Sequence, residues 1–170
     1  MGEFRTIRPE EADPIFDRIN KGWFLLSAAD GERTNTMTVS WATVGTLWNK
    51  SVAICYVRPQ RYTYGILENT DRLTLTSLPE QYREALRFCG KASGRDCDKF
   101  KEAGLTCATT ENGAPYPAEG ELVLVCKKLY ADDIKRENFI SEEPLYTYEK
   151  NDFHRFYICE IEKVLARVQD

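Results

Sequence analysis

Asn35-Thr36-Met37-Thr38-Val39-Ser40-Trp41 is a stretch in which hydroxyl and apolar side chains alternate after the initial asparagine. Successive side chains of a β-strand point to opposite faces, so the three apolar residues share one face and the three hydroxyl residues the other. The stretch therefore predicts a strand, which we place over residues 37–44. The same alternation is typical of an ordinary half-buried strand and of a strand that lines a ligand site, so both interpretations stay open.

Further β-prone runs, rich in Val, Ile, Tyr and Thr, lie on both sides of this stretch. They cover residues 23–29, 51–57, 72–77, 121–130 and 153–168. Short helices are predicted at 60–69, 79–89 and 96–103, and an exposed loop at 111–117. A chain with at least six strands and few helices is mainly β (α+β), and we expect an antiparallel barrel because closure removes exposed strand edges. The 170 residues contain no repeat or linker, which predicts one domain over residues 1–170.

The charge balance argues against two classes of partner. The chain has 23 Lys and Arg against 27 Asp and Glu, a net charge of −4, and lacks the basic cluster that nucleic acid binding requires. No apolar run approaches the roughly 18 residues of a membrane span, and the first residues do not resemble a signal peptide. We therefore expect a cytoplasmic protein that binds neither nucleic acid nor membrane.

The six cysteines do not form a metal-binding or disulfide pattern. No Cys-x-x-Cys pair is present, and the single histidine, His154, has no ligand partner at zinc-like spacing, so no metal site is predicted. Cys55, Cys126 and Cys159 lie in apolar runs and are interpreted as buried residues without disulfides. The others, at 89, 97 and 107, flank polar loops, where a redox or exposed thiol stays an alternative.

Two later segments gather cations close to predicted helix starts. Arg58-Pro59-Gln60-Arg61-Tyr62-Thr63 follows the strand at 51–57, and Gly90-Lys91-Ala92-Ser93-Gly94-Arg95-Asp96-Cys97-Asp98-Lys99-Phe100 precedes the helix at 96–103. Arginine forks, hydroxyl groups and helix N-termini are suited to a phosphate. A salt-bridged arginine beside a capping threonine, and a helix start capped by an aspartate, are the structural alternatives.

Several common catalytic arrangements are missing from the sequence. There is no Walker-type Gly-Lys-Ser/Thr motif, no Gly-x-Gly-x-x-Gly after a strand and no Gly-x-Ser-x-Gly elbow. A Ser/His/Asp triad would have to use His154, which we interpret as a structural or surface residue. The sequence predicts no catalytic side chains. A ligand with a phosphate group, bound without a Walker or Gly-x-Gly-x-x-Gly motif, stays a possible interpretation.

Taken together and in this order, the three quoted segments resemble the flavin reductase-like family, which binds FMN in a split β-barrel, and in particular its flavoredoxin-like branch. The resemblance extends from about residue 20 to residue 164. It implies an antiparallel Greek-key barrel with short flanking helices, and a homodimer with the flavin close to the subunit interface, where Arg95 and Lys99 would be near the partner's site.

The resemblance also implies a set of FMN-binding residues. The strand residues Asn35, Thr36, Met37 and Thr38 would lie along the isoalloxazine ring. The phosphate would be held by Arg58, Thr63, Ser93, Gly94 and Lys99. Trp48 and Ser77 are placed near the flavin only by their positions at strand ends.

The function that the resemblance implies is flavin redox chemistry, in which the cofactor carries the reaction and the protein binds and orients it. The first hypothesis is an NAD(P)H-dependent reductase of flavin, ferric iron or another acceptor, with NADH or NADPH as a transient donor. The alternative is a flavoredoxin-like electron carrier that holds FMN tightly and is reduced by another protein. A third is a ligand-binding module of the same fold without redox turnover.

Overall fold

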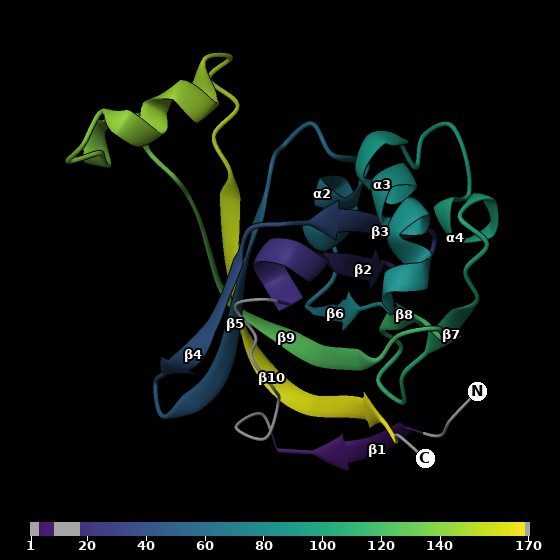
Figure 1. Cartoon of the computed structure of the whole chain (residues 1–170). Helices are drawn as coiled ribbons and strands as arrows, with labels where there is room; N and C mark the ends of the chain where they lie inside the picture. Colours follow the sequence, from purple (N-terminus) through teal and green to yellow (C-terminus); the bar gives the residue numbers. More distant parts are fainter. Residues whose placement is uncertain (1–3, 9–17, 169–170) are drawn as a thin grey trace.

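The computed structural model describes residues 4–8 and 18–168, which build a bent antiparallel sheet with short helices around it (Figure 1). The strands are β1 (Phe4–Ile7), β2 (Phe24–Ala29), β3 (Thr34–Val39), β4 (Ala42–Leu47), β5 (Lys50–Val57), β6 (Arg72–Ser77), β7 (Cys107–Thr109), β8 (Pro115–Pro117), β9 (Leu122–Asp133) and β10 (Arg155–Arg167). The helical segments are η2 (Arg18–Gly22), α2 (Tyr62–Leu67), η3 (Glu80–Tyr82), α3 (Arg83–Lys91), α4 (Lys99–Glu102), η4 (Arg136–Asn138) and η5 (Glu143–Tyr148). None of the helices in these ranges is long and apolar enough to cross a membrane.

The strands pair in the order β3-β2-β6-β9-β10-β5-β4, with β1 added to β10, and every pairing is antiparallel. The long strands β9 and β10 join the two halves and contain bulges after Ile158 and Ile161, which bend the sheet. The predicted mainly β, antiparallel fold class is confirmed. The hydrogen-bonded order is nevertheless an open path, so the expected closure into a complete barrel is not observed among the described strands.

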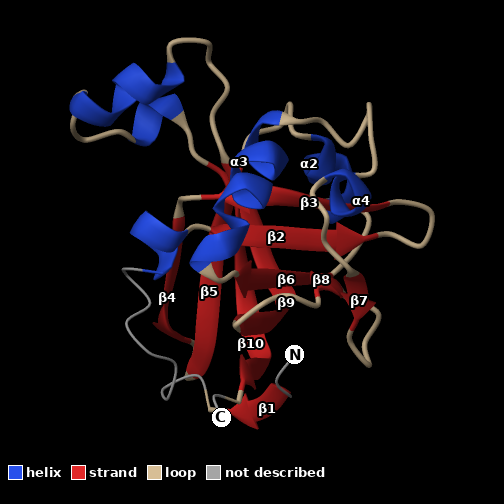
Figure 2. Cartoon of the chain, turned by 45° about the vertical axis from the view of Figure 1, so that its right-hand side comes forward, coloured by secondary structure: helices blue, strands red, loops and turns tan. Residues whose placement is uncertain are grey.

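The ends of the path, β3 and β4, come from the single strand predicted at 37–44. The chain breaks at Ser40 and Trp41, and β4 then pairs with β5 instead of continuing along β2. At the edge of the sheet, α3 packs against β3, and Thr38 Oγ1 donates a hydrogen bond of 2.5 Å to Leu86 O of this helix. Figure 2 shows α2, α3 and α4 gathered over β2 and β3. A helix thus protects an edge that closure would otherwise have removed.

Two apolar cores hold these layers together. The larger fills the bend of the sheet with side chains that include Phe24, Leu75 and Tyr157. The smaller lies under α3 and α4 around Leu86 and Phe100. Of the alternating apolar residues at 37, 39 and 41, Met37 and Val39 belong to the larger core, whereas Trp41 is 46% exposed. Burial of such side chains is the main source of stability for a sheet of this kind.

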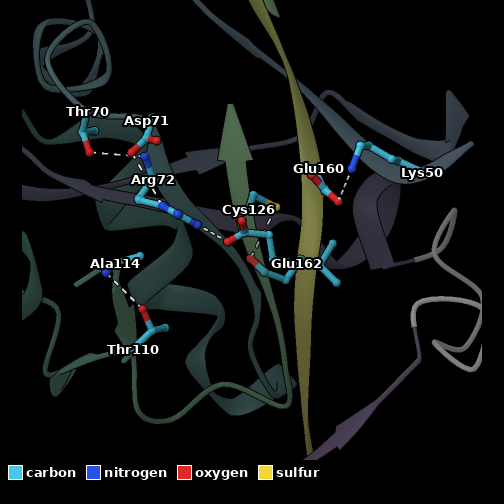
Figure 3. A network of polar contacts seen from close by, with 10 residues as sticks. Lys50, Thr70, Asp71, Arg72, Thr110, Ala114, Cys126, Glu160 and Glu162 are labelled. Atoms are coloured by element: carbon cyan, nitrogen blue, oxygen red, sulfur yellow. Dashed lines mark hydrogen bonds and ion pairs between the residues drawn. The ribbon is translucent and has the colours of Figure 1, made fainter. Parts of the chain in front are cut away.

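Ion pairs tie β10 to two other strands. Figure 3 shows Glu160 paired with Lys50 of β5, at 2.7 Å between the charged atoms, and Glu162 paired with Arg72 of β6. The second pair spans β9, which lies between β6 and β10. These contacts are partly exposed and contribute modestly to stability compared with the cores.

The predicted helices are present but shorter or divided. The helix at 60–69 is α2, the one at 79–89 is η3 followed by α3, and the one at 96–103 is α4, capped by Asp98. The exposed loop predicted at 111–117 is wrong in part, because Ala114 is buried and Pro115–Pro117 forms β8 against β7. The segment with η4 and η5 was not predicted as a unit, and it stands away from the sheet (upper left in Figure 1).

Candidate functional site

Three of the expected site residues meet where β3, α2 and the loop before α4 come together. Asn35 Nδ2 donates a hydrogen bond of 2.8 Å to Thr63 Oγ1, and both residues are buried. Gly94 lies directly against this pair, since a Cβ at that position would overlap the Asn35 side-chain amide and the Tyr62 ring. The close approach explains why glycine is needed there.

Two cations lie beside this junction, at the C-terminal end of α3. Lys99 is 3% exposed and donates to Cys89 O at 2.9 Å, while Arg61 donates to Gly90 O at 2.8 Å. Carbonyl groups at a helix C-terminus carry partial negative charge and attract cations. Neither side chain forms an ion pair with any carboxylate in residues 4–8 and 18–168. A buried lysine and a half-buried arginine without a carboxylate partner are suited to an anionic ligand.

The protonation of the two cations reflects their burial. Burial, reinforced by the charge of Arg61, lowers the pKa of Lys99 to about 8. Burial also lowers the pKa of Arg61. Arg61 was not predicted as a site residue, because nothing in the local sequence pattern distinguishes it from Arg58.

The loop that follows α3 adds polar groups near the start of α2. Ser93 Oγ accepts a hydrogen bond from Arg95 N at 3.2 Å. The Arg95 guanidinium donates to Gln60 O at 3.2 Å and lies 5.4 Å above the Tyr62 ring centroid. This loop therefore brings a hydroxyl group and a third cation toward the same end of α2.

A pocket of about 210 Å³ runs from this region along β3 toward the start of β10. Its lining residues are Met37, Thr38, Val39, Ser40, Trp41, Tyr56, Arg58, Arg61 and His154. Thr36 points elsewhere: it is fully buried, and its hydroxyl oxygen accepts a hydrogen bond of 2.9 Å from Ser27 Oγ. The structure thus brings Met37 and Thr38 to the pocket and places the Thr36 side chain within the sheet packing.

At the other end of the pocket, Arg58 contacts the segment that stands away from the sheet. Its guanidinium forms an ion pair with Asp152, donates to Thr147 O at 3.0 Å and lies 5.5 Å from the Tyr148 ring centroid. The hydrogen bond from Arg58 is the main cause that lowers the pKa of Asp152. Arg58 lines the pocket as expected for a ligand-binding residue, but its charge already has a protein partner.

His154 is buried next to Arg58 and forms one wall of the pocket. Its Nδ1 lies 2.9 Å from the Tyr148 hydroxyl, and its ring lies 5.0 Å from the Trp41 ring centroid. Burial, with a smaller contribution from the Arg58 charge, lowers the pKa of His154 to about 4. The imidazole is therefore neutral at pH 7. His154 was expected to be a structural or surface residue, and the structure buries it in the wall of the pocket.

A second and more apolar pocket, of about 620 Å³, lies on the other side of Trp41. It shares Ser40, Trp41 and Tyr56 with the first pocket. Its other lining residues are Ile19, Asn20, Ala42, Thr43, Val44, Ile134 and Tyr148, none of which is charged. A polar, cation-lined pocket and an apolar pocket thus adjoin each other, as expected for a ligand with a charged end and a flat apolar end.

The two remaining expected site residues lie further away. Ser77 pairs with Phe24, whose other neighbour in the sheet is Val39, and its hydroxyl accepts a hydrogen bond of 3.4 Å from Arg18. Trp48 is 55% exposed at the tip of the β4–β5 hairpin, at the opposite end of β5 from Arg58. Eight strand residues span about 25 Å, so the structure does not bring Trp48 to this pocket within the chain.

The structure confirms the three cysteines expected to be buried but differs for Cys89, which was placed beside a polar loop. Cys55, Cys126 and Cys159 are buried in the core. Cys89 is also buried, which raises the pKa of its thiol to about 11 and disfavours a reactive thiolate. Within the described ranges, no group of three or more His, Cys, Asp or Glu side chains is arranged to hold a metal ion.

Comparisons with known proteins find the same kind of relative for the sequence and for the fold. A sequence profile described as a flavin reductase-like domain matches residues 16–168, whereas no curated protein matches the sequence significantly. A solved FMN-binding domain of a flavin reductase-like enzyme from Shewanella baltica has a TM-score of 0.73 at 15% identity, covering 98% of this chain and 78% of that one.

Two further solved structures share the fold at similarly low sequence identity. Flavoredoxin from Desulfovibrio vulgaris has a TM-score of 0.67 at 23% identity, covering 85% of this chain and 68% of its own. An NADH:FAD oxidoreductase from Streptomyces globisporus has a TM-score of 0.66 at 17% identity, with 86% and 74% covered. These likenesses show the split-barrel fold, and the profile match over most of the sequence shows that this chain belongs to the flavin reductase-like family.

Proposed function

We propose that this protein binds FMN and acts as an NAD(P)H-dependent flavoprotein reductase. The observation that carries the proposal is a pair of cations without a carboxylate partner among the described residues: Arg61, which is half-buried and lines the pocket along β3, and Lys99, which is buried beside it at the end of α3. A phosphate at this place would supply the missing negative charge. The donor set, two cations with hydroxyl groups nearby, fits the phosphate of FMN.

The proposed cofactor site follows from the positions of the residues around the pocket. Lys99 and Arg61 would bind the phosphate, with Ser93 and Thr63 as hydroxyl donors and with Gly94 permitting the close packing of the loop. The strand from Asn35 to Thr38 would lie along the isoalloxazine, with backbone groups toward its polar edge. Arg58 was expected to hold the phosphate as well, but its guanidinium already forms an ion pair with Asp152.

FMN, when bound, supplies the redox chemistry by accepting a hydride from NADH or NADPH and returning two electrons to an acceptor. The protein's own part is to orient the reactants and exclude water. Trp41 and Tyr56, which line both pockets, present flat apolar surfaces against which aromatic rings pack. The neutral imidazole of His154 adds no charge to this wall.

The acceptor would be free flavin, ferric iron or another small molecule, and the uncharged lining of the larger pocket fits the flat apolar ring of a free flavin best. A carrier of the flavoredoxin type, reduced by another protein, is the second candidate. The observation that favours it is the half-enclosed wall formed by Tyr148 and His154, which would restrict the approach of a second nucleotide to the flavin. We further propose a homodimer in the cytoplasm.

The test begins with the purified protein. We expect flavin absorption in the protein as isolated or after addition of FMN, bleaching by NADH or NADPH under anaerobic conditions, and recovery of colour with ferric chelate or free flavin. Reduction by dithionite but by neither nucleotide would replace the reductase with the carrier. Absence of FMN binding at micromolar concentrations would contradict both.

A further inference from the structure

The segment at residues 134–154, here called the arm, leaves the sheet after β9 and returns at the start of β10 (Figure 1). A backbone hydrogen bond of 2.9 Å from Ile134 N to His154 O closes its base. Its far part is open to solvent, because Ile140 is fully exposed and Tyr146 is 72% exposed. The position of the arm therefore depends on contacts near its base.

Those contacts converge on the connection between β5 and α2. Among the described residues, the side-chain hydrogen bonds between this connection and the arm all involve Arg58 or Gln60. Arg58 pairs with Asp152 and donates to Thr147 O at 3.0 Å, and Gln60 Nε2 donates to Asp152 Oδ2 at 2.9 Å. One arginine thus fastens the arm at two points of its returning half.

The fastened half supplies walls to both pockets. Tyr148 lines the apolar pocket and His154 the polar one, and the two side chains are joined by the 2.9 Å contact between the Tyr148 hydroxyl and the imidazole. Tyr148 also stacks on Phe153, with ring centroids 4.6 Å apart. A shift of the arm would consequently move both walls together.

We propose that Arg58 is a positioning residue, which holds the arm through Asp152 and Thr147 and so keeps Tyr148 and His154 in place for the nicotinamide ring of the electron donor. This rests on the proposed function. The guanidinium is already neutralised by a carboxylate, so a phosphate would first have to displace Asp152, which Gln60 also holds. Arg61 and Lys99, and not Arg58, would then bind the phosphate.

The experiment compares Arg58→Gln, Asp152→Asn and the double variant, with Lys50→Gln as a control that removes another ion pair from β5. Hydrogen exchange of residues 135–152 reports the arm, fluorescence titration reports FMN affinity, and quenching of tryptophan fluorescence by NAD⁺ reports nicotinamide binding. The KM and kcat for NADH complete the set.

We expect both single variants to speed exchange of the arm at least tenfold, to weaken NAD⁺ binding and raise the KM for NADH at least fivefold, and to leave kcat within about twofold. FMN affinity should stay within about threefold. The double variant should be no worse than either single one, because both remove the same contact. The control should change none of these quantities.

Two results would overturn the proposal. If Arg58→Gln weakens FMN binding more than tenfold while exchange of the arm is unchanged, and Asp152→Asn tightens FMN binding, Arg58 is a phosphate ligand. If exchange rises but NAD⁺ binding does not change, the arm does not shape the donor site. Should Arg58→Gln fail to fold, Asp152→Asn carries the comparison alone. Hydrogen exchange and NAD⁺ binding can be measured even if neither nucleotide reduces the flavin. Failure of the proposed reductase activity can therefore be distinguished from failure of the role proposed for Arg58.

Discussion

Arg58 and Lys99 were both expected to bind the FMN phosphate, yet they differ in burial and in their ion-pair partners. Arg58 is partly exposed and pairs with Asp152, whereas Lys99 is buried and donates only to a backbone carbonyl. A paired cation stabilises the segment that carries its partner, while a buried cation without a carboxylate keeps unsatisfied charge. A cation near a pocket is therefore evidence for an anionic ligand only when the fold leaves its charge unpaired.

At the Arg58 end of the pocket, protonation of the buried His154 imidazole should destabilise the folded protein in acid. His154 has its pKa lowered from 6.5 to about 4, so between these values the unfolded chain binds more protons than the folded one. Stability is therefore complete above pH 6.5 and is lost as the pH falls toward 4. The shift corresponds to about 3 kcal/mol in the free energy of unfolding.

This prediction is measured by urea unfolding of the protein and of His154→Gln at pH 7 and pH 4. The protein should lose about 3 kcal/mol more than the variant over this interval. An equal loss in both would mean that His154 takes up its proton freely in the folded state, and that the imidazole is not buried in the pocket wall.

The unpaired charge at the other end predicts a large effect on ligand affinity. Lys99→Met keeps the length of the side chain but removes a charge-assisted contact of about 1.5 to 3 kcal/mol, so FMN binding should weaken by roughly thirtyfold. The free energy of unfolding without ligand should not fall, because the variant also removes a desolvated charge. Fluorescence titration with FMN measures the first quantity and urea unfolding the second.

The matched control is Lys101→Met, on the exposed side of the same short helix. It should leave FMN affinity unchanged. Since the pKa of Lys99 is about 8, FMN affinity of the unmodified protein should also decline by up to tenfold per pH unit above 8, and Lys99→Met should lack this decline. If Lys101→Met has the larger effect, the ligand binds by general surface charge.

Local patterns predicted the elements well, and contacts between distant residues account for what they missed. β-prone composition located the strands at 23–29, 51–57 and 72–77, because a run of Val, Ile, Tyr and Thr is a local property of the sequence. The break at Ser40 and Trp41 depends on the pairing of β4 with β5, which no local pattern encodes.

The candidate site shows the same limit. The expected group at Asn35, Thr63 and Gly94 is brought together, because the resemblance carried information about non-local contacts. The engagement of Arg58 by Asp152, 94 residues later in the chain, could not be read from either local sequence. The same holds for the role of Arg61, whose environment is created by the end of α3.

The smallest expected effect concerns Trp48, the expected site residue that lies farthest from both ends of the pocket. Trp48 and Asn49 form the turn between β4 and β5 with positive φ values of 53° and 56°, a conformation that favours glycine. Trp48→Gly relieves strain of about 1 kcal/mol, but glycine loses a similar amount of chain entropy on folding, so the free energy of unfolding should stay within about 1 kcal/mol. FMN affinity should change less than twofold, because β5 separates the turn from Arg58 and His154 by about 25 Å. A loss of FMN affinity above tenfold with unchanged stability would show that the hairpin tip reaches a flavin after all, which within this fold would require the site of a second subunit.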